Sequence, residues 1–203
     1  MTWSASVSGT SVELVKPAVA EVNFRDMAHT LSQINRFGGR SMATVSVAQH
    51  LIIGCDIAPE QLRPWWLLHD AHEERTGDVT SPVKEAMSAV AREMFGEQGV
   101  IIVEEVRRQF EYRHDAVIHQ AAGLPLPTKA QKIEIKHIDW ITLATERRDF
   151  HARQHRPWWI DQYKVQPHSK RYRPLPPAKA ADQLYSLFTR YLPALAGACG
   201  RVA

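Results

Sequence analysis

The sequence of 203 residues has little cysteine and no long apolar run. Its two cysteines, Cys55 and Cys199, fit neither a disulfide framework nor a metal-binding spacing, so we expect a protein of the reducing cytoplasm. No run approaches the ~18 apolar residues of a membrane-spanning helix, and residues 1–6 lack the basic-then-apolar pattern of a signal peptide. Neither an internal repeat nor a low-complexity tract is present. These absences leave one ordinary globular domain, or a domain with an appendage.

Charge is distributed unevenly along the chain. The whole sequence carries a formal +3, from 25 Lys and Arg against 22 Asp and Glu. The stretch from Arg147 to Arg190 holds ten basic and three acidic residues, a local +7, so the remainder carries −4. A basic tail on a mildly acidic body is compatible with phosphate-bearing ligands, although many such tails are simply solvated.

Local patterning predicts an all-α protein. Residues 1–22 are expected to be irregular or extended, because Pro17 and an alternation of Val and Ser disfavour a helix. Asn23 is a plausible N-cap for the first helix, which ends in the glycine turn at residues 36–40. Apolar periodicity, caps and prolines predict further helices over about 46–54, 59–76, 81–95, 100–121, 129–151 and 179–195.

The chain is expected to divide into three parts. An N-terminal segment, 1–22, precedes a helical core at 23–151. Residues 152–203 form a basic, aromatic C-terminal arm and a terminal helix, in which the proline-rich stretch from 157 to 177 is expected to be an extended lid. Packing across an oligomer interface is the role we expect for this arm.

The segment Trp65–Glu74 is an apolar helical stretch that ends in titratable groups. His69 and Asp70 are adjacent, about 100° apart on a helix, and could still reach one ion beside it. Glu73 follows three residues after Asp70 and four after His69, so it shares a helical face with both. A ligand pair with a carboxylate one turn on indicates a metal site with a general acid or base beside it. The alternative is the solvated end of an amphipathic helix.

Two further residues favour a metal site. A lone His in an apolar helix is more often a core residue, but His50 is followed within one helical hairpin by a second metal-type pair. Asp139 stands in an apolar helix, where a carboxylate is expensive to bury unless it is paired or bound to metal. The alternative for Asp139 is an edge position bonded to Lys132 or Lys136.

Several side chains around this segment could bind a nucleotide. Arg36 could clamp phosphate with its planar fork, and Phe37 could stack on a base. A helix-capping arginine and a core phenylalanine are the simpler alternatives for these two. Lys84 lies in the first turn of a helix, a natural anion site, unless it is only a surface lysine. Asp78 is equally well explained as a turn-making aspartate.

A second His-Asp pair, His114-Asp115, occurs with His119 in the helix expected at 100–121. Its polar flanks resemble a solvated face, and no carboxylate lies one turn downstream. We therefore do not assign it to the site. The functional alternative is a second metal ion.

His50, His69-Asp70 and Asp139, in that order on separate helices, resemble the H…HD…D signature of the HD-domain metal-dependent phosphohydrolases. The likeness extends over Asn35-Arg36-Phe37, Ser46-Val47-Ala48-Gln49-His50 and His69-Asp70-Ala71-x-Glu73-x-x-x-Gly77-Asp78-x-x-x-Pro82-x-Lys84. These segments resemble the 5′-deoxynucleotidase branch and a phage-type branch that includes a dATP triphosphohydrolase. The resemblance spans about Phe24 to Phe150 and implies an HD-domain helical bundle, usually oligomeric, that acts on nucleotides.

The resemblance implies one divalent metal ion, of Zn, Mn, Co or Fe. The implied site residues are His50, His69, Asp70 and Asp139 as metal ligands, Glu73 as the catalytic carboxylate, Arg36 and Lys84 at the phosphate, Phe37 near the base or sugar, and Asp78 at the sugar pocket. Arg40 departs from the pattern, because phage-type members often have a His there.

These observations predict an enzyme that frees the nucleoside from a 5′-(deoxy)nucleotide. A triphosphohydrolase that releases tripolyphosphate is the close alternative, because the basic arm could contact a longer phosphate chain. A third hypothesis is a non-catalytic nucleotide- or nucleic-acid-binding module, motivated by the aromatic residues interleaved with basic ones in the arm. We expect a nucleotide substrate and a homo-oligomer, and neither a membrane nor a nucleic-acid partner.

Overall fold

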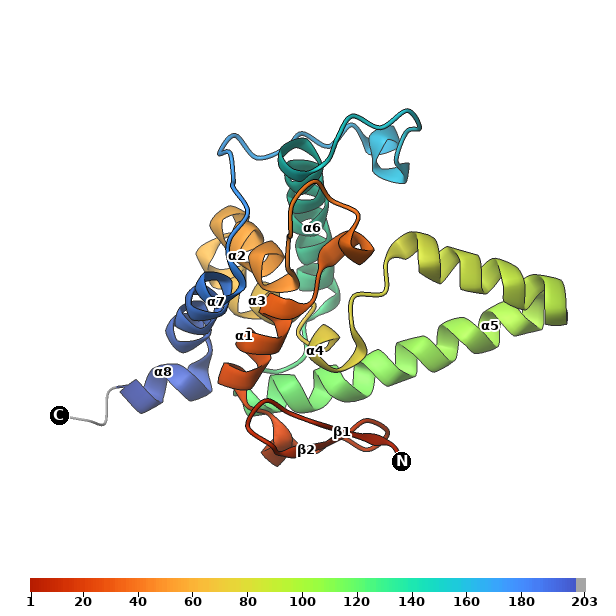
Figure 1. The fold of residues 1–203 in the computed structure, drawn as a ribbon. Coiled ribbons are helices and arrows are strands. Elements are labelled where there is room, and N and C mark those ends of the chain that lie inside the picture. Colours follow the sequence, from red (N-terminus) through yellow and green to blue (C-terminus); the bar gives the residue numbers. More distant parts are fainter. Residues whose placement is uncertain (200–203) are drawn as a thin grey trace.

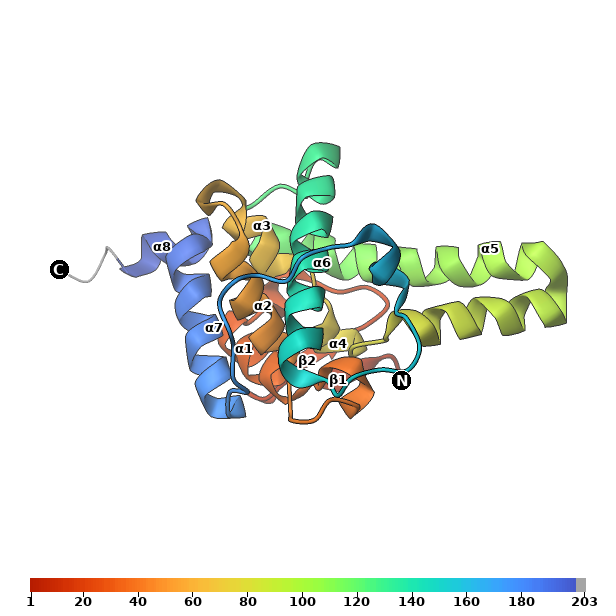
Figure 2. The same ribbon diagram turned by 90° about the horizontal axis from the view of Figure 1, so that it is seen from above.

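A computed structural model describes residues 1–199 and has an all-α fold with one small sheet (Figures 1 and 2). The elements are β1 (Trp3–Ala5), β2 (Ser11–Glu13), α1 (Phe24–Gln33), α2 (Val47–Ile57), α3 (Arg63–Leu68), α4 (Glu73–Thr76), α5 (Ser81–Ala121), α6 (Lys129–Phe150), α7 (Pro177–Tyr191) and α8 (Pro193–Cys199). Short 3₁₀ turns occur at Val19–Glu21, Arg36–Gly39, Glu60–Leu62 and Trp159–Tyr163. Within the described part of the chain, no helix combines the length and the apolar character that crossing a membrane requires.

Side-chain caps begin three of the helices. The Asn23 side chain accepts hydrogen bonds from two backbone amides in the first turn of α1, as the sequence predicts. Ser46 caps α2 by accepting from the amide of Gln49. Thr128 and Gln131 form a reciprocal capping box at the start of α6. These local signals place the helices that carry His50 and Asp139.

The N-terminal segment, expected to be irregular or extended, contains a short β-hairpin. Strands β1 and β2 pair antiparallel, with Trp3 opposite Glu13. The Ser8 hydroxyl in the connecting turn donates a 2.5 Å hydrogen bond to Asp26 Oδ2 on α1, and the Ser8 amide donates to the same oxygen. The hairpin is thereby attached to the first helix of the body.

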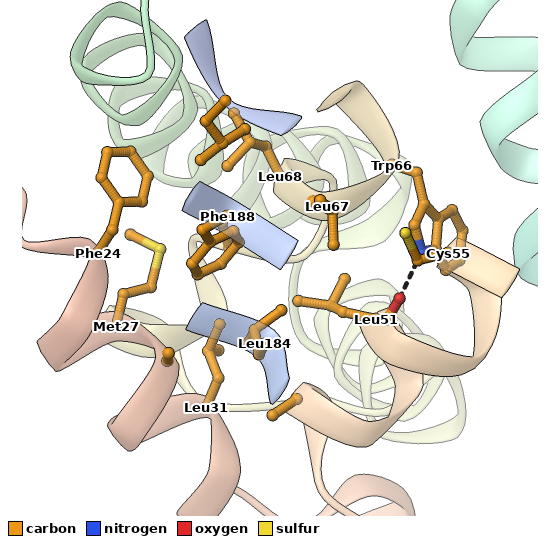
Figure 3. Packing of buried hydrophobic residues seen from close by; sticks show 14 of the residues in the cluster. Phe24, Met27, Leu31, Leu51, Cys55, Trp66, Leu67, Leu68, Leu184 and Phe188 are labelled. Atoms are coloured by element: carbon orange, nitrogen blue, oxygen red, sulfur yellow. Dashed lines mark hydrogen bonds between the residues drawn. The ribbon is translucent and has the colours of Figure 1, made fainter. Parts of the chain in front are cut away.

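The main hydrophobic core lies between α1, α2, α3 and α7 (Figure 3). The Trp66 indole is fully buried and donates from Nε1 to the backbone oxygen of Leu51 at 2.8 Å. It packs against Gly54 so closely that a Cβ at that position would lie 1.8 Å from the ring. On the other side, Phe24 meets Phe188 edge to face.

The C-terminal helix belongs to this core rather than to a separate part. Leu184 and Phe188 of α7 are completely buried against α1 and α2. The prediction of one terminal helix over 179–195 is wrong in one respect: α7 ends at Tyr191, and a second helix, α8, begins at Pro193. Proline lacks the amide that would continue the hydrogen-bond ladder. The side chain of Cys199 lies outside the described residues.

The helix expected over 59–76 is broken where the titratable groups lie. Helix α3 ends at Leu68 and α4 begins at Glu73. Between them the chain makes tight turns, with the Glu73 amide bonded to the Asp70 oxygen at 3.1 Å. The Trp66 carbonyl, which would accept the Asp70 amide in an α-helix, instead accepts from the amide and from Nδ1 of His69. The imidazole thus competes with the helix for one acceptor.

Helix α5 consists of two antiparallel arms, as the two predicted helices require. They meet at Gly96, whose φ of 67° and ψ of −164° only glycine adopts without strain. Figures 1 and 2 both show the arms projecting together away from the body. We call residues 81–112 the α5 hairpin below.

The arm from 151 to 176 crosses over α6 and α2 on the way to α7 (Figure 2). Two of its six basic residues pair with the body, Arg171 with Asp149 at 2.9 Å and Lys170 with Asp56 at 2.6 Å. In addition, Asp161 of the arm pairs with Arg147 of α6. The extended segment is therefore held on its own chain by charge pairing.

Candidate metal centre

Four ligand-type atoms from three elements converge on one point. His50 projects from α2, His69 and Asp70 from the turn after α3, and Asp139 from α6. His50 Nε2 lies 3.4 Å from His69 Nε2, 3.5 Å from Asp70 Oδ2 and 3.6 Å from Asp139 Oδ1. His69 Nε2 lies 3.2 Å from Asp70 Oδ2. The atoms of His50, His69 and Asp139 all lie within 4.8 Å of one another, whereas Asp70 contacts the two histidines but lies outside this mutual group.

The opposite ring nitrogens fix the orientation of both imidazoles. His50 Nδ1 lies 3.1 Å from Glu146 Oε1, and His69 Nδ1 lies 2.7 Å from the backbone oxygen of Trp66. Because both partners are acceptors, Nδ1 of each ring carries the proton and Nε2 presents its lone pair to the cluster. This is the arrangement in which histidine binds metal ions.

The residues fit a divalent cation. Two imidazole nitrogens and two carboxylates face one another, and this donor set favours a cation between them. Asp139 also has the partner that the sequence offered as the alternative, because Lys136 Nζ lies 2.9 Å from Asp139 Oδ2. Burial disfavours protonation of His69, yet the charges of Asp70 and Asp139 outweigh it and raise the pKa of this imidazole. Ligands at about 2.0–2.2 Å from a tetrahedral ion are roughly 3.3–3.6 Å apart, close to the separations found here. A mixed nitrogen and oxygen set suits Zn, Mn, Co or Fe.

Glu146 is a member of the site that the sequence analysis missed. Its carboxylate is completely buried and lies on α6, two turns after Asp139. One oxygen contacts His50, and the other lies 3.2 Å from a guanidinium nitrogen of Arg36. The signal in the sequence was an acidic residue seven positions beyond Asp139 on the same apolar helix. An acidic residue at this spacing does not by itself indicate a role in the site, because its contact with His50 can be seen only in the folded structure.

Arg36 lies between the metal ligands and Glu146. Its side chain is nearly buried, with one nitrogen 3.8 Å from Asp70 Oδ2. Burial opposes the charge, but Glu146 and Asp70 raise the pKa of Arg36 above its usual value, so it stays cationic. Its Nε atom is buried and has no hydrogen-bond partner within residues 1–199. The guanidinium therefore adjoins the cluster and retains an unused donor.

Glu73 is buried beside the cluster at the start of α4. Burial, together with the charges of Asp70 and Asp78, raises the pKa of Glu73 to about 10. A divalent cation held by Asp70 would lower that pKa, because its charge favours the carboxylate. Glu73 Oε2 is buried without a hydrogen-bond partner among the described residues. An unpaired buried carboxyl is costly, which is typical of a group kept for a proton-transfer role.

One cavity is lined by ligands of the cluster, and a second is lined by Glu73. The first cavity has a volume of about 260 Å³ and a partly apolar lining, and three of the predicted metal ligands, His69, Asp70 and Asp139, contribute to its wall. The other lining residues are Trp65, Leu68, Tyr112, Asp115, His119, Leu126, Pro127, Lys132, Ile135 and Lys136. The second, of about 190 Å³, is lined by His72, Glu73, Thr76, Gly77, Val79, Lys84, Arg107, Phe110 and Glu111. The carboxyl of Glu73 thus faces a different cavity from Asp139.

The flanks of the second His-Asp pair are largely exposed, as expected, but the histidines between them are not. His114 and His119 are buried, and Asp115 accepts a 3.0 Å hydrogen bond from His72 Nδ1. His119 Nδ1 donates to the backbone oxygen of Pro125 at 3.1 Å. Nothing in the sequence indicated this burial, because the contacts come from distant segments: α5 packs against α3 and the 3₁₀ turn Val19–Glu21, and Arg75 Nη1 lies 3.3 Å from His114 Nδ1. In the part of the chain that the structure describes, the group of potential metal ligands excludes all three residues.

The remaining predicted site residues, Asp78, Lys84 and Phe37, have three different environments. Asp78 is half-buried, and burial raises its pKa although Arg36 opposes the shift. Lys84 lines the second cavity with its Nζ atom 3.4 Å from Glu111 Oε1. Phe37 lines neither cavity; its ring packs edge-on against His151 and lies near Trp158 of the arm. Its φ of 59° is unusual for a bulky residue and marks a strained loop next to Arg36.

Comparison with known proteins assigns no activity. No family model matches the chain. It is 30% identical over 149 residues to the uncharacterized protein YfdR of Escherichia coli (strain K12), covering 73% of this chain and 72% of that protein. It is 27% identical over 154 residues to the uncharacterized protein RCAP_rcc00048 of Rhodobacter capsulatus, covering 71% of this chain and 70% of that protein.

Proposed function

We propose that this chain, which belongs to the same family as the uncharacterized protein YfdR of Escherichia coli, is a metal-dependent nucleotide phosphohydrolase of the HD-domain type. The proposed reaction adds water to the 5′ phosphoester of a (deoxy)nucleotide and yields the free nucleoside and inorganic phosphate. The observation that carries the proposal is the convergence of His50, His69, Asp70 and Asp139 beside the buried, unpaired carboxyl of Glu73.

The four converging residues would hold one divalent ion. When bound, such an ion lowers the pKa of a coordinated water and neutralises charge on a phosphoryl group. Glu146 and the Trp66 carbonyl orient the two imidazoles, so the ligand geometry is set before any ion arrives. A structural zinc site would favour thiolates, and Cys55 is a buried free thiol in the α2 core rather than a neighbour of the cluster.

Glu73 is the proposed proton carrier. It would take a proton from the attacking water or deliver one to the leaving nucleoside oxygen, and such transfers typically give about 10² to 10⁴-fold. Arg36 would use its free Nε donor toward a phosphate oxygen while its other nitrogens keep Glu146 and Asp70 in place. Lys84 would contribute a further positive charge across the second cavity.

The first cavity supports a nucleoside as the leaving group. It places the aromatic side chains of Trp65 and Tyr112, with Leu126 and Ile135, next to the ligands His69 and Asp139. An apolar pocket with a few convergent polar groups is the usual form of a small-molecule site. Asp115 and His119 would supply the polar contacts that recognise a base or a sugar.

A dNTP triphosphohydrolase that releases tripolyphosphate is the second candidate. The observation that favours it is the presence of Lys132 and Lys136 on the wall of the first cavity, although Lys136 Nζ lies 2.9 Å from Asp139 Oδ2 and is partly engaged there. These cations could hold a longer phosphate chain. The basic arm offers less support than the sequence suggested, because Lys170 and Arg171 are engaged with Asp56 and Asp149.

A nucleic-acid-binding module has weaker support. Its motivation was a set of aromatic side chains in the arm, free to stack on bases. Tyr163 instead stacks on Trp140 of α6, and Trp158 packs against His151 beneath the guanidinium of Arg147. Rings occupied in this way do not form a stacking platform. We also propose that the protein is cytoplasmic, because the buried thiol of Cys55 is free, as is usual in a reducing compartment.

The test is a product analysis with the metal-reconstituted full-length protein. Nucleoside mono-, di- and triphosphates are incubated separately with Zn, Mn, Co or Fe(II), with a chelator control, and the products are separated by chromatography. Phosphate and nucleoside from a monophosphate support the first candidate, and tripolyphosphate from a triphosphate supports the second. A metal-loaded protein inert toward every nucleotide would overturn both.

A further inference from the structure

The α5 hairpin exposes an unusual amount of apolar surface. Eight large aliphatic, Met or Phe side chains on its two arms are between 44% and 67% exposed: Val83, Met87, Val90, Met94, Phe95, Ile101, Ile102 and Val106. Tyr112 at its base is 50% exposed. On the first arm, positions 83, 87, 90 and 94 follow a 4-3-4 spacing, which aligns them in one stripe along the helix. Elsewhere a single exposed apolar residue needs no explanation, but a continuous stripe indicates a contact surface.

The two arms have little to hold them to each other. Between residues 81 and 112, only Ala91, Gly99 and Val100 are buried. The arms cross closely there, since a Cβ on Gly99 would lie 2.6 Å from the Ala91 oxygen. Isolated helices of about four turns are marginal in water, and most helical stability comes from packing an apolar face. The apolar side chains of the hairpin are exposed, and both arms project away from the body of the molecule (Figure 1).

We propose that the α5 hairpin pairs with the α5 hairpin of a second copy of this chain, and that the apolar stripe is the core of a two-fold dimer interface. This inference concerns assembly and does not depend on the proposed chemistry. Its first support is area. Eight side chains that each expose on the order of 100 Å² amount to roughly 800 Å², about what one partner contributes to a stable interface of standard size.

Charge favours a second copy over an anionic partner. Residues 81–112 carry four basic and six acidic side chains, so a membrane surface or a nucleic acid would meet net negative charge. Several of these charges pair within the hairpin, including Arg92 with Glu97 and Arg108 with Glu105. A surface with both signs interspersed around an apolar stripe can place opposite charges against each other when it meets an identical surface, as a two-fold interface requires.

The pairing would also bear on the second cavity. Lys84 on the first arm and Arg107, Phe110 and Glu111 on the second arm line this cavity at the base of the hairpin. A partner that clamps both arms would fix the distance between these side chains. Assembly would therefore order the cavity into which Glu73 projects.

The experiment measures mass in solution by sedimentation and light scattering. The intact protein is expected to be a dimer of 23.0 kDa chains in the micromolar range. The double variant Val90→Glu/Ile102→Glu places a carboxylate on each arm of both copies and should raise the dimer dissociation constant by roughly 100-fold or more. The matched control is Met42→Glu/Ile133→Glu, because these side chains are 66% and 72% exposed but lie outside the hairpin.

A second measurement uses the unaltered protein. Amide hydrogen exchange in the α5 hairpin should slow as protein concentration rises through the dissociation constant, while exchange in α1 and α7 should not depend on concentration. A monomeric protein at the highest attainable concentration would overturn the inference. An oligomer that persists in the Val90→Glu/Ile102→Glu variant, with exchange in the hairpin unchanged by dilution, would overturn it as well.

Discussion

The helical body and the α5 hairpin treat their side chains differently. In the body, His50 is completely buried and both of its ring nitrogens have partners. At the tip of the hairpin, Met94 and Phe95 are 66% and 67% exposed. The two regions lie in one chain and use the same secondary structure. In the body, each functional side chain is held by several elements, so its position is fixed by packing. In the hairpin, geometry depends on two crossing arms and one glycine turn.

The difference indicates what each region can be used for. A metal centre needs ligands held to within a fraction of an ångström, which only a packed interior provides. A surface that meets a partner needs the opposite, because its apolar groups must remain accessible until the partner arrives. The substitutions that follow test this contrast.

Removal of a ligand should have the largest effect. Asp139→Ala is expected to lose both bound metal and activity, because one carboxylate of a four-residue set is deleted. Metal per chain is measured by elemental analysis, and turnover by phosphate release. Asp182→Ala, at an exposed position on α7, is the control. Equal metal content and near-normal activity in Asp139→Ala would refute the ligand assignment.

Substitution of Glu73 should separate chemistry from metal binding. Glu73→Gln is expected to keep the metal and lower turnover by about 10² to 10⁴-fold, since the amide cannot transfer the proton. Glu74→Gln is the matched control: this neighbouring carboxylate is paired with Arg75. A Glu73→Gln enzyme with normal turnover would exclude Glu73 as the proton carrier, and one that loses metal would make it a ligand.

The orientation of His50 should depend on Glu146. Glu146→Gln leaves a neutral side chain opposite Nδ1 and removes the charge that Arg36 neutralises, so metal affinity should fall by about 10- to 100-fold. Competition with a chromogenic chelator measures this affinity. Glu134→Gln, at an exposed position on the same helix, should leave it unchanged. Unaltered affinity in Glu146→Gln would show that packing alone orients the ring.

Stability should separate the two regions most directly. Leu184→Ala removes a fully buried side chain from the core and should lower the free energy of unfolding by about 2–5 kcal/mol. Val90→Ala in the hairpin should change it by no more than about 0.5 kcal/mol at concentrations where the protein is monomeric. Denaturant titrations give both values, and similar losses in the two variants would contradict the contrast.

Much of the fold followed from local signals. Caps at Asn23 and Thr128, the break at Gly96 and the apolar periodicity of α6 depend on neighbours in the chain, so the sequence contained the information needed to place these helices. The break between Leu68 and Glu73 was not predicted, because it results from the competition of the His69 imidazole for the Trp66 carbonyl. A side-chain contact of this kind leaves the pattern of apolar residues unchanged.

The sequence by itself determined which residue types the chain offers for metal and phosphate, and in which order along the helices. Only the tertiary structure decided that Glu146 contacts His50 from 96 positions away, and that His114 and His119 face inward. It also decided that Phe37 packs on the arm and that the α5 hairpin leaves its stripe uncovered. The physical reason is that burial and pairing belong to surfaces that meet in space, whereas propensity and capping act within one or two helical turns.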